Sequence, residues 1–475
     1  MRVRLRLDGL PAAAWGSFAR MDNWSKLVVF FLWISVLLGK ASAYLGMAIG
    51  MLMLLDVRVL WNRWYLALTR NGDPFSGVAW ALLVSLVYGI AQVVRGCLFL
   101  GFPVATALEI LVFNLCPVFL FLGLWAGARH QEIVRNYIRF VALFLVAYTP
   151  LYVLFFRKFT ISLSGILPGT NMNLLGSPGT GSWALLGLLS YESRLGQWWL
   201  PIVVLICLIV ANEARADWLG FVVALGVWGF LRRRVGRVAA IVCAIAAVLA
   251  IGFIADLRLP PIPGRGGEIS ARATVARLAG AISTDLAEQV GGDAADARFY
   301  YGTVYWREHW WESIRNEISQ NSQNVLFGLG YGFPLDTLGG PTTTGTRSPH
   351  NIFYFALAYS GAIGVAIFFW LEISVIRLLW RSYKLTGDVY GLSYFCYAIL
   401  GAFFGNLLET PQGGIAIYLM LGLLLGPVCV VSRAEQRTAI AEWSYDQQET
   451  VPSSRLTQAL DPAIPAKILR SRPTP

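Results

Sequence analysis

The stretch NIFYFALAYSGAIGVAIFFWLEISVI, from Asn351 to Ile376, decides the fold of this chain. It is a long, almost continuously apolar run, and about 20 such residues in a helix cross the roughly 30 Å hydrocarbon core of a bilayer. Over all 475 residues, 56% are hydrophobic and 14% are charged, against roughly 25% charged in soluble domains. We therefore expect a membrane protein.

Similar apolar segments recur along the chain and predict about twelve spans. Lipid offers backbone N–H and C=O groups no water, so each span is expected to be a helix. The predicted fold class is an all-α, polytopic membrane bundle with a large helical loop on its outer face. The expected spans are residues 25–39, 41–57, 77–95, 103–127, 138–156, 179–192, 196–212, 215–231, 238–255, 351–376, 389–408 and 413–431.

These segments divide the chain into four parts. Residues 1–255 and 350–431 form the first and last parts of the bundle, 256–349 form an outer loop that covers the active site, and 432–475 form a cytoplasmic tail. A connection as long as 256–349 is usually functional.

The basic residues predict the orientation of the bundle. With both termini inside, the inner connections and termini carry 25 of the 38 Lys and Arg residues, including RRRVGR (Arg232 to Arg237). The net charge of +11 is then mainly a signal for membrane topology, and no nucleic-acid partner is expected. The basic N-terminus followed by ASA (Ala41 to Ala43) also resembles a cleavable signal peptide, but its long polar lead favours an uncleaved anchor.

The six cysteines all lie in or beside apolar segments. The outer loop holds none, so neither a disulfide framework nor a thiolate metal site is expected there.

Two helices are expected in the outer loop. The first is Ile269 to Val290, which GGDAADAR (Gly291 to Arg298) ends, and the second is Thr303 to Asn321. In the second helix Trp306, Trp310, Ile314 and Ile318 share one face at spacings of four, a pattern typical of a helix on or near the membrane surface.

Three ionisable residues are expected at the outer surface of the bundle. Arg215 starts the eighth span, Arg307 lies in the Trp-rich helix, and His350 precedes the tenth span. Guanidinium groups bind phosphate bidentately, and histidine accepts a proton near neutral pH. Each residue also has a structural interpretation: an interfacial anchor for Arg215, a solvated helix face for Arg307 and a helix cap for His350 with Asn351.

The combined pattern resembles a known superfamily. The segment VYWREHWWESIRNEISQNSQNVLFGLGYGF (Val304 to Phe333) is followed by SPHNIFYFALAYSGAIG (Ser348 to Gly364). An Arg a turn before a Trp, then G-x-G, then His-Asn leading into a helix with G-x-x-G, is similar to the signature of O-antigen ligases and O-antigen polymerases. ARADWLG (Ala214 to Gly220) resembles that family's Arg-containing helix start.

The resemblance implies a GT-C-like membrane glycosyltransferase of the bacterial inner membrane, with its active site on the periplasmic face. Its donor would be an undecaprenyl diphosphate-linked glycan, and its acceptor would be a hydroxyl of lipid A-core or another glycan. The reaction would invert the anomeric configuration and would need no metal or cofactor. Arg215 and Arg307 would hold the diphosphate and His350 would be the base or orient the acceptor. The residues expected to bind diphosphate or glycan are Arg215, Arg307, Arg298, Trp306 and Asn351.

Three alternatives stay open. A polymerase shares the donor chemistry and differs only in its acceptor. A metal-dependent transferase would use Asp293 and Asp296, although a solvated loop is the simpler interpretation of this pair. A lipid-linked glycan transporter would need paired intramembrane polar groups. Glu109 is the best intramembrane acid that the sequence offers, but a structural hydrogen bond to a neighbouring helix is a simpler interpretation of this residue than transport.

Overall fold

The structure is a computed structural model of the chain. It describes residues 21–38, 45–46, 48–49, 52, 61–70, 72–154, 160–162, 171–173, 182–191, 215–256, 258–259, 269–279, 283–291, 294–339 and 348–449. Residues Met1–Val430 form one compact unit and Val431–Pro475 a second one, and the helix α19 (Pro411–Glu449) continues from the first into the second.

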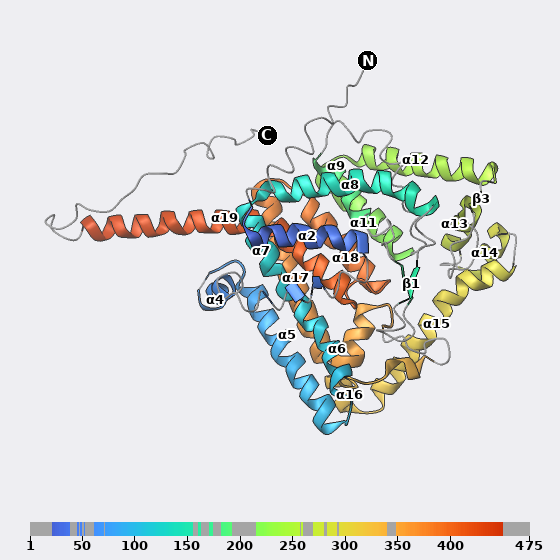
Figure 1. The fold of residues 1–475 in the computed structure, drawn as a ribbon, viewed down its shortest axis with the longest axis horizontal. Helices are drawn as coiled ribbons and strands as arrows, with labels where there is room; N and C mark the ends of the chain where they lie inside the picture. The colour runs from blue at the N-terminus through green and yellow to red at the C-terminus, as the bar shows by residue number, and fades with distance from the viewer. Residues whose placement is uncertain are drawn as a thin grey trace, which may run out of the picture. The chain divides into compact units, whose positions relative to one another are not determined.

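The described residues are mostly helical, as the sequence predicts (Figure 1). Four strands of two or three residues pair antiparallel, β1 (Thr160–Ser162) with β2 (Asn171–Asn173) and β3 (Arg258–Leu259) with β4 (Ile269–Ser270). The helices before the outer loop are α2 (Asn23–Leu38), α4 (Trp61–Thr69), α5 (Ser76–Val94), the π-helix η2 (Arg95–Phe99), α6 (Val104–Leu115), the 3-10 turn η3 (Cys116–Val118), α7 (Phe119–Arg129), α8 (Gln131–Leu154), α9 (Ser182–Tyr191), α11 (Arg215–Leu231) and α12 (Val235–Ile254). Those that follow are α13 (Ala271–Ala279), α14 (Thr284–Gly291), α15 (Ala294–Ser319), α16 (Ser322–Phe327), the 3-10 turn η6 (Leu335–Leu338), α17 (Ile352–Thr386), α18 (Tyr390–Phe403) and α19.

Within the described residues, five helical segments are long and apolar enough to cross a membrane. They are Ser76–Phe99, Val104–Arg129, Val235–Ile254, Ile352–Thr386 and Gly413–Val431. Trp218–Leu231 and Tyr390–Phe403 are shorter apolar helices. The chain is thus a multi-pass membrane protein by length and composition, whereas the total of about twelve spans stays a prediction. The predicted segment 196–212 lies outside the described residues and 41–57 largely so.

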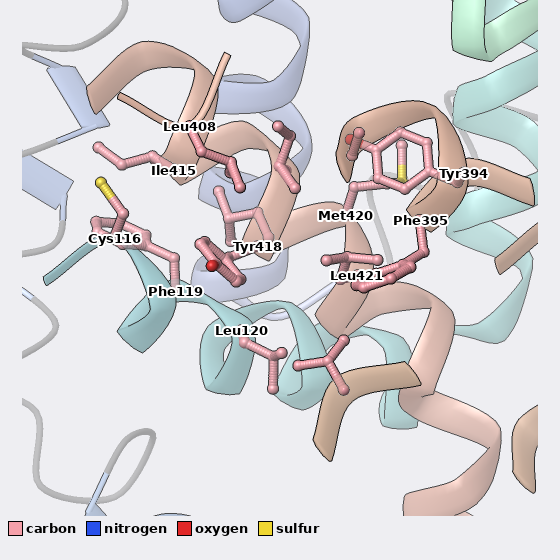
Figure 2. Close-up of a cluster of buried hydrophobic side chains, with 14 of the residues drawn as sticks. Cys116, Phe119, Leu120, Tyr394, Phe395, Leu408, Ile415, Tyr418, Met420 and Leu421 are labelled. Carbon is pink, nitrogen blue, oxygen red and sulfur yellow. The ribbon is translucent and has the colours of Figure 1, made fainter. Parts of the chain in front are cut away.

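Glycine allows two helices of the bundle to touch along their backbones. A Cβ on Gly123 of α7 would lie 2.0 Å from the Leu419 carbonyl oxygen of α19, and one on Gly422 would lie 2.0 Å from the Leu120 carbonyl oxygen. Small residues at such contacts are the usual basis of close helix packing in membranes. Figure 2 shows the side chains of α7, α18 and α19 that fill the core around this contact, with Tyr418 among them.

α11 and α18 pack against each other and run antiparallel. Gly220 near the start of α11 lies against Tyr397 of α18, while Arg232 just after α11 shares a cavity with Asp388 just before α18. The start of α11 and the end of α18 therefore lie at the same end of the bundle. α17 packs against both α5 and α18 (Figure 1).

The outer loop differs from the prediction in two ways. The single helix expected over Ile269–Val290 is replaced by β4, α13 and α14, and residues 280–282 between these two helices lie outside the described residues. Part of the expected break GGDAADAR is helical, because α15 already begins at Ala294. Both errors have one cause: an Ala-rich sequence has a high helix propensity everywhere, so it does not report where helices begin and end.

The Trp-rich face of α15 packs inside the protein and not against the membrane surface. Trp310 and Ile314 are fully buried, and Ile318 is nearly so. The indole Nε1 of Trp310 donates a hydrogen bond of 2.9 Å to the Leu335 carbonyl oxygen of η6. The prediction of an interfacial helix was wrong because an apolar face at helical spacing looks the same whether lipid or protein covers it.

Candidate active site

Asn351 fixes the start of α17. Its side-chain oxygen accepts hydrogen bonds from the backbone N–H groups of Phe353 at 2.9 Å and Tyr354 at 3.3 Å. This is the N-cap that the sequence offered as the structural interpretation of this residue, and it satisfies two backbone donors that the helix start leaves unpaired. It also holds His350 directly at the mouth of α17.

The His350 backbone has a positive φ of 56°. Only a few per cent of residues other than glycine adopt this conformation, so the surrounding contacts define the position of the imidazole closely. Nδ1 lies 3.2 Å from the Ser348 hydroxyl, and the ring meets Trp306 of α15 edge-on with centroids 5.9 Å apart. α15 is anchored beside this turn because Trp311 Nε1 donates to the Pro349 carbonyl oxygen at 2.9 Å.

Arg307 reaches from α15 to the end of α18. Its Nη1 donates to the Phe404 carbonyl oxygen at 3.2 Å, and its guanidinium lies 5.6 Å from the centre of the Trp306 ring. Burial lowers the pKa of Arg307, and the nearby Glu409 carboxyl opposes that shift. Nε is buried and forms no hydrogen bond to any residue that the structure describes. A buried guanidinium N–H without a partner is costly in a resting protein and suits a site that receives an anion.

Glu409 is a site residue that the sequence did not reveal. It lies two residues before Pro411, which occupies the first position of α19, as proline commonly does at a helix start. The Ser348 hydroxyl donates a short hydrogen bond to Oε2, while Oε1 is buried and has no hydrogen-bond partner among the described residues. Ser348 therefore connects Glu409 to His350.

Burial raises the pKa of Glu409 to about 8. The Ser348 hydroxyl, the backbone N–H groups of His350 and Asn351, and the Arg307 charge all favour the carboxylate, but desolvation outweighs them. A carboxyl group with its pKa shifted this far, beside a histidine and an arginine, marks a candidate for proton-handling chemistry.

The glycine motif before His350 positions α16 and α15. Gly328 has φ of 73°, and a Cβ there would lie 2.6 Å from the backbone nitrogens of Ser360 and Gly361. Gly361 has φ of 64° and interrupts the helical geometry of α17, so the turn after α16 fits into this break. The Leu329 N–H donates a 2.7 Å hydrogen bond to the Ala358 carbonyl oxygen, which stabilises the contact between this turn and α17.

Arg95 of η2 holds this turn from the opposite side. Nη1 donates to the Phe327 carbonyl oxygen at 3.0 Å and Nη2 to the Gly328 carbonyl oxygen at 3.0 Å, and Gln92 adds a 2.9 Å bond to Phe327. The guanidinium thus supports the G-x-G turn instead of lying in the site.

The remaining predicted site residues are described only in part. Arg215 is the first residue of α11, so its backbone lies at the same end of the bundle as Phe404, the partner of Arg307. The side chains of Arg215 and Arg298 lie outside those that the structure describes. The structure therefore brings together Arg307, His350 and Trp306, and the roles of the other two arginines stay predictions.

The polar groups behind the rival interpretations lie elsewhere. Asp293, and the side chain of Asp296, fall outside the described residues, within which no group of three or more His, Cys, Asp and Glu residues is arranged to hold a metal ion. Glu109 is exposed on α6. Among the described residues Glu372 of α17 is a buried acid that the sequence analysis did not single out, and it accepts a short hydrogen bond from the Tyr418 hydroxyl of α19.

Comparison with protein families identifies one matching model. Residues 200–369 match the family described as O-Antigen ligase. This confirms the resemblance seen in the motifs, and the matched range contains Arg215, Arg298, Arg307 and His350 but neither Arg95 nor Glu409. No curated protein sequence matches the chain.

Proposed function

We propose that this chain, whose residues 200–369 match the O-antigen ligase family model, is a membrane glycosyltransferase that moves a glycan from undecaprenyl diphosphate to an acceptor hydroxyl. The acceptor is lipid A-core or a similar glycolipid, and the reaction takes place at the periplasmic face of the bacterial inner membrane. The observation that carries the proposal is the junction of Arg307, His350, Ser348 and Glu409 at the start of α17.

The hydrogen bonds of Ser348 assign a tautomer to His350. When the Glu409 carboxyl is ionised, Ser348 donates its one hydroxyl proton to Glu409, so in that state the 3.2 Å contact with His350 requires Nδ1 to be the donor. The neutral imidazole then carries its lone pair on Nε2, the form that a general base needs. Glu409 and Ser348 act as positioning residues for this base.

The proposed reaction is a single displacement. The acceptor hydroxyl gives its proton to Nε2 of His350 while its oxygen forms the new bond to the anomeric carbon of the donor sugar. The bond between that carbon and the diphosphate oxygen breaks, and the diphosphate leaves with one additional negative charge. Arg307, with Arg215 at the start of α11, stabilises this charge, and the configuration at the anomeric carbon is inverted.

Arg307 is suited to this role because its Nε–H has no partner among the described residues while Nη1 is anchored on Phe404. An anchored guanidinium loses little conformational freedom when an oxyanion arrives, and its charge is stronger in a site from which water is excluded. Trp306 packs against both Arg307 and His350, so it holds the distance between the two groups and offers an apolar face to a sugar ring.

The test is a transfer assay with the full-length protein in lipid nanodiscs. It uses a defined undecaprenyl diphosphate-linked glycan, with either lipid A-core or a second donor glycan as acceptor, each with and without a chelator. We expect transfer to lipid A-core that the chelator does not reduce. Transfer only to the second glycan would identify a polymerase. Loss of transfer in the presence of chelator would indicate a metal-dependent enzyme. Movement of the donor across vesicle membranes without a new glycosidic bond would indicate a transporter.

A further inference from the structure

A polar cavity lies at the end of α17 away from His350. Its volume is about 420 Å³, within the range of roughly 300–1,000 Å³ of small-molecule sites. Arg135 of α8 and Arg232 after α11 line it, together with Ser190 of α9 and Thr386 of α17. None of these residues takes part in the proposed glycan transfer.

The cavity and the active site lie at opposite ends of a span. From Gly361, where α17 has its break, to Thr386 the helix rises by about 37 Å at 1.5 Å per residue. This exceeds the roughly 30 Å of the hydrocarbon core. His350 and Thr386 are therefore on opposite faces of the membrane, and the cavity is at the level of the headgroups on the face away from the transferase site.

The charge of the cavity is positive. Its lining contains two arginines and one carboxylate, Asp388, whose oxygens accept hydrogen bonds from the Tyr191 hydroxyl at 2.7 Å and the Tyr390 N–H at 2.9 Å. Arg135 packs over the Tyr191 ring at 5.5 Å. Within the part of the chain that the structure describes, neither Arg135 nor Arg232 forms an ion pair with a carboxylate. No described carboxylate therefore competes with an anion for their N–H groups through an ion pair.

The same cavity has an apolar side. Leu423, Leu424 and Pro427 of α19 also line it. On the neighbouring surface of α17, Trp380 is exposed and Lys384 lies 5.7 Å from its ring, the pairing of an aromatic and a basic residue that is typical of a membrane–water interface. A ligand with a charged head and an apolar body suits this lining better than a free ion does.

We propose that this cavity binds the phosphate of an anionic lipid headgroup, held by Arg135 and Arg232, with its glycerol and upper acyl carbons against α19. Arginine binds phosphate oxygens in pairs, and basic pockets between transmembrane helices recognise acidic lipid headgroups. The site goes beyond the transferase reaction and does not depend on it. It links α8, α9, α11, α17 and α19 through a lipid at the face away from the active site.

The experiment compares lipid retention by three forms of the full-length protein in native mass spectrometry. The forms are the wild type, the double variant Arg135→Gln/Arg232→Gln, and the charge-matched control Arg233→Gln/Arg237→Gln, whose residues lie in the same basic segment, Arg232 to Arg237, but outside the lining. Each is titrated with phosphatidylglycerol, with phosphatidylcholine and with inorganic phosphate. Size-exclusion profiles verify that all three are folded.

We expect the wild type to bind one phosphatidylglycerol at least about 10-fold more tightly than phosphatidylcholine. The cavity variant should lose this preference, while the control keeps most of it, and excess inorganic phosphate should not displace the lipid. Equal losses in both double variants would overturn the site, because they would show a general basic surface. Full displacement by inorganic phosphate would overturn the lipid as its ligand, and no preference in the wild type would overturn both. Transfer activity is not the readout, so failure of this proposal is separate from failure of the proposed function.

Discussion

Ser348 joins two groups of different chemistry at the residue scale. It donates to the Glu409 carboxyl and contacts His350 Nδ1, so one small side chain couples the protonation of an acid to the tautomer of a base. His350 and Arg307 were predictable because the motifs around them are distinctive. Glu409 was not predictable, because a lone glutamate in LLETPQ (Leu407 to Gln412) is typical of an ordinary solvated turn. It lies 61 residues after Ser348 in the sequence, and only the tertiary structure brings the two side chains together.

Glu409 makes the stability of the protein depend on pH. Its pKa is about 8 in the folded state, against 4.5 for the ordinary value. Between these values an unfolded chain releases a proton that the folded chain keeps, so this contribution to stability is complete below the lower pKa and is lost as the pH rises towards about 8.

We expect Glu409→Gln to remove that contribution. The measurement is the thermal unfolding midpoint in detergent across this pH window for the wild type, Glu409→Gln and the exposed control Glu308→Gln. The wild type and the control should lose stability as the pH rises, and the Glu409 variant should lose less. Parallel pH profiles for all three proteins would show that Glu409 titrates normally.

At the scale of elements, the junction of α16 with α17 decides where the site residues lie. Gly328 and Gly361 both have positive φ, and their backbones approach too closely for a side chain. Arg95 and Gln92 hold the same turn from η2. The G-x-G part of the motif therefore serves the architecture of the site and not its chemistry.

Gly328→Ala should destabilise the protein by about 2 kcal/mol or more, because it adds backbone strain at positive φ to a clash with the backbone of α17. Gly226→Ala is the matched control, since a Cβ at this position in α11 meets nothing within 4 Å, and we expect its effect to stay within about 1 kcal/mol. Denaturation in detergent gives both values. Similar small effects at the two positions would contradict the described fit of the turn.

Element boundaries show where sequence reasoning succeeds and where it stops. Long apolar runs predicted the segments that form α5, α6 with α7, α12, α17 and the first half of α19, because burial in lipid requires length and little else. The outer loop was harder. The apolar face of α15 was assigned to the membrane surface, whereas η6 covers Trp310, and nothing in the spacing of that face distinguishes the two environments.

At the scale of the whole molecule, the two ends of the bundle have different proposed tasks. The proposed active site lies at the start of α17, and the basic cavity lies near its end. The orientation in the membrane is a prediction from the excess of basic residues in the expected inner connections.

Accessibility labelling checks this orientation. Gln320→Cys just after α15 and Arg237→Cys in the first turn of α12 both introduce an exposed thiol. A membrane-impermeant maleimide should label the first in intact spheroplasts and the second only after permeabilisation, with the unmodified chain giving the background from its six cysteines. The reverse pattern would place the proposed active site in the cytoplasm.

We propose that the group of residues at the start of α17 carries out glycan transfer. The most direct test is the initial transfer rate of His350→Ala in nanodiscs with the defined donor, compared with the wild type and with His309→Ala, an exposed histidine on α15. We predict a loss of at least about 100-fold for His350→Ala, with Arg215→Ala equally inactive and His309→Ala close to the wild type. A folded, inserted His350→Ala protein with near-normal transfer would contradict the account.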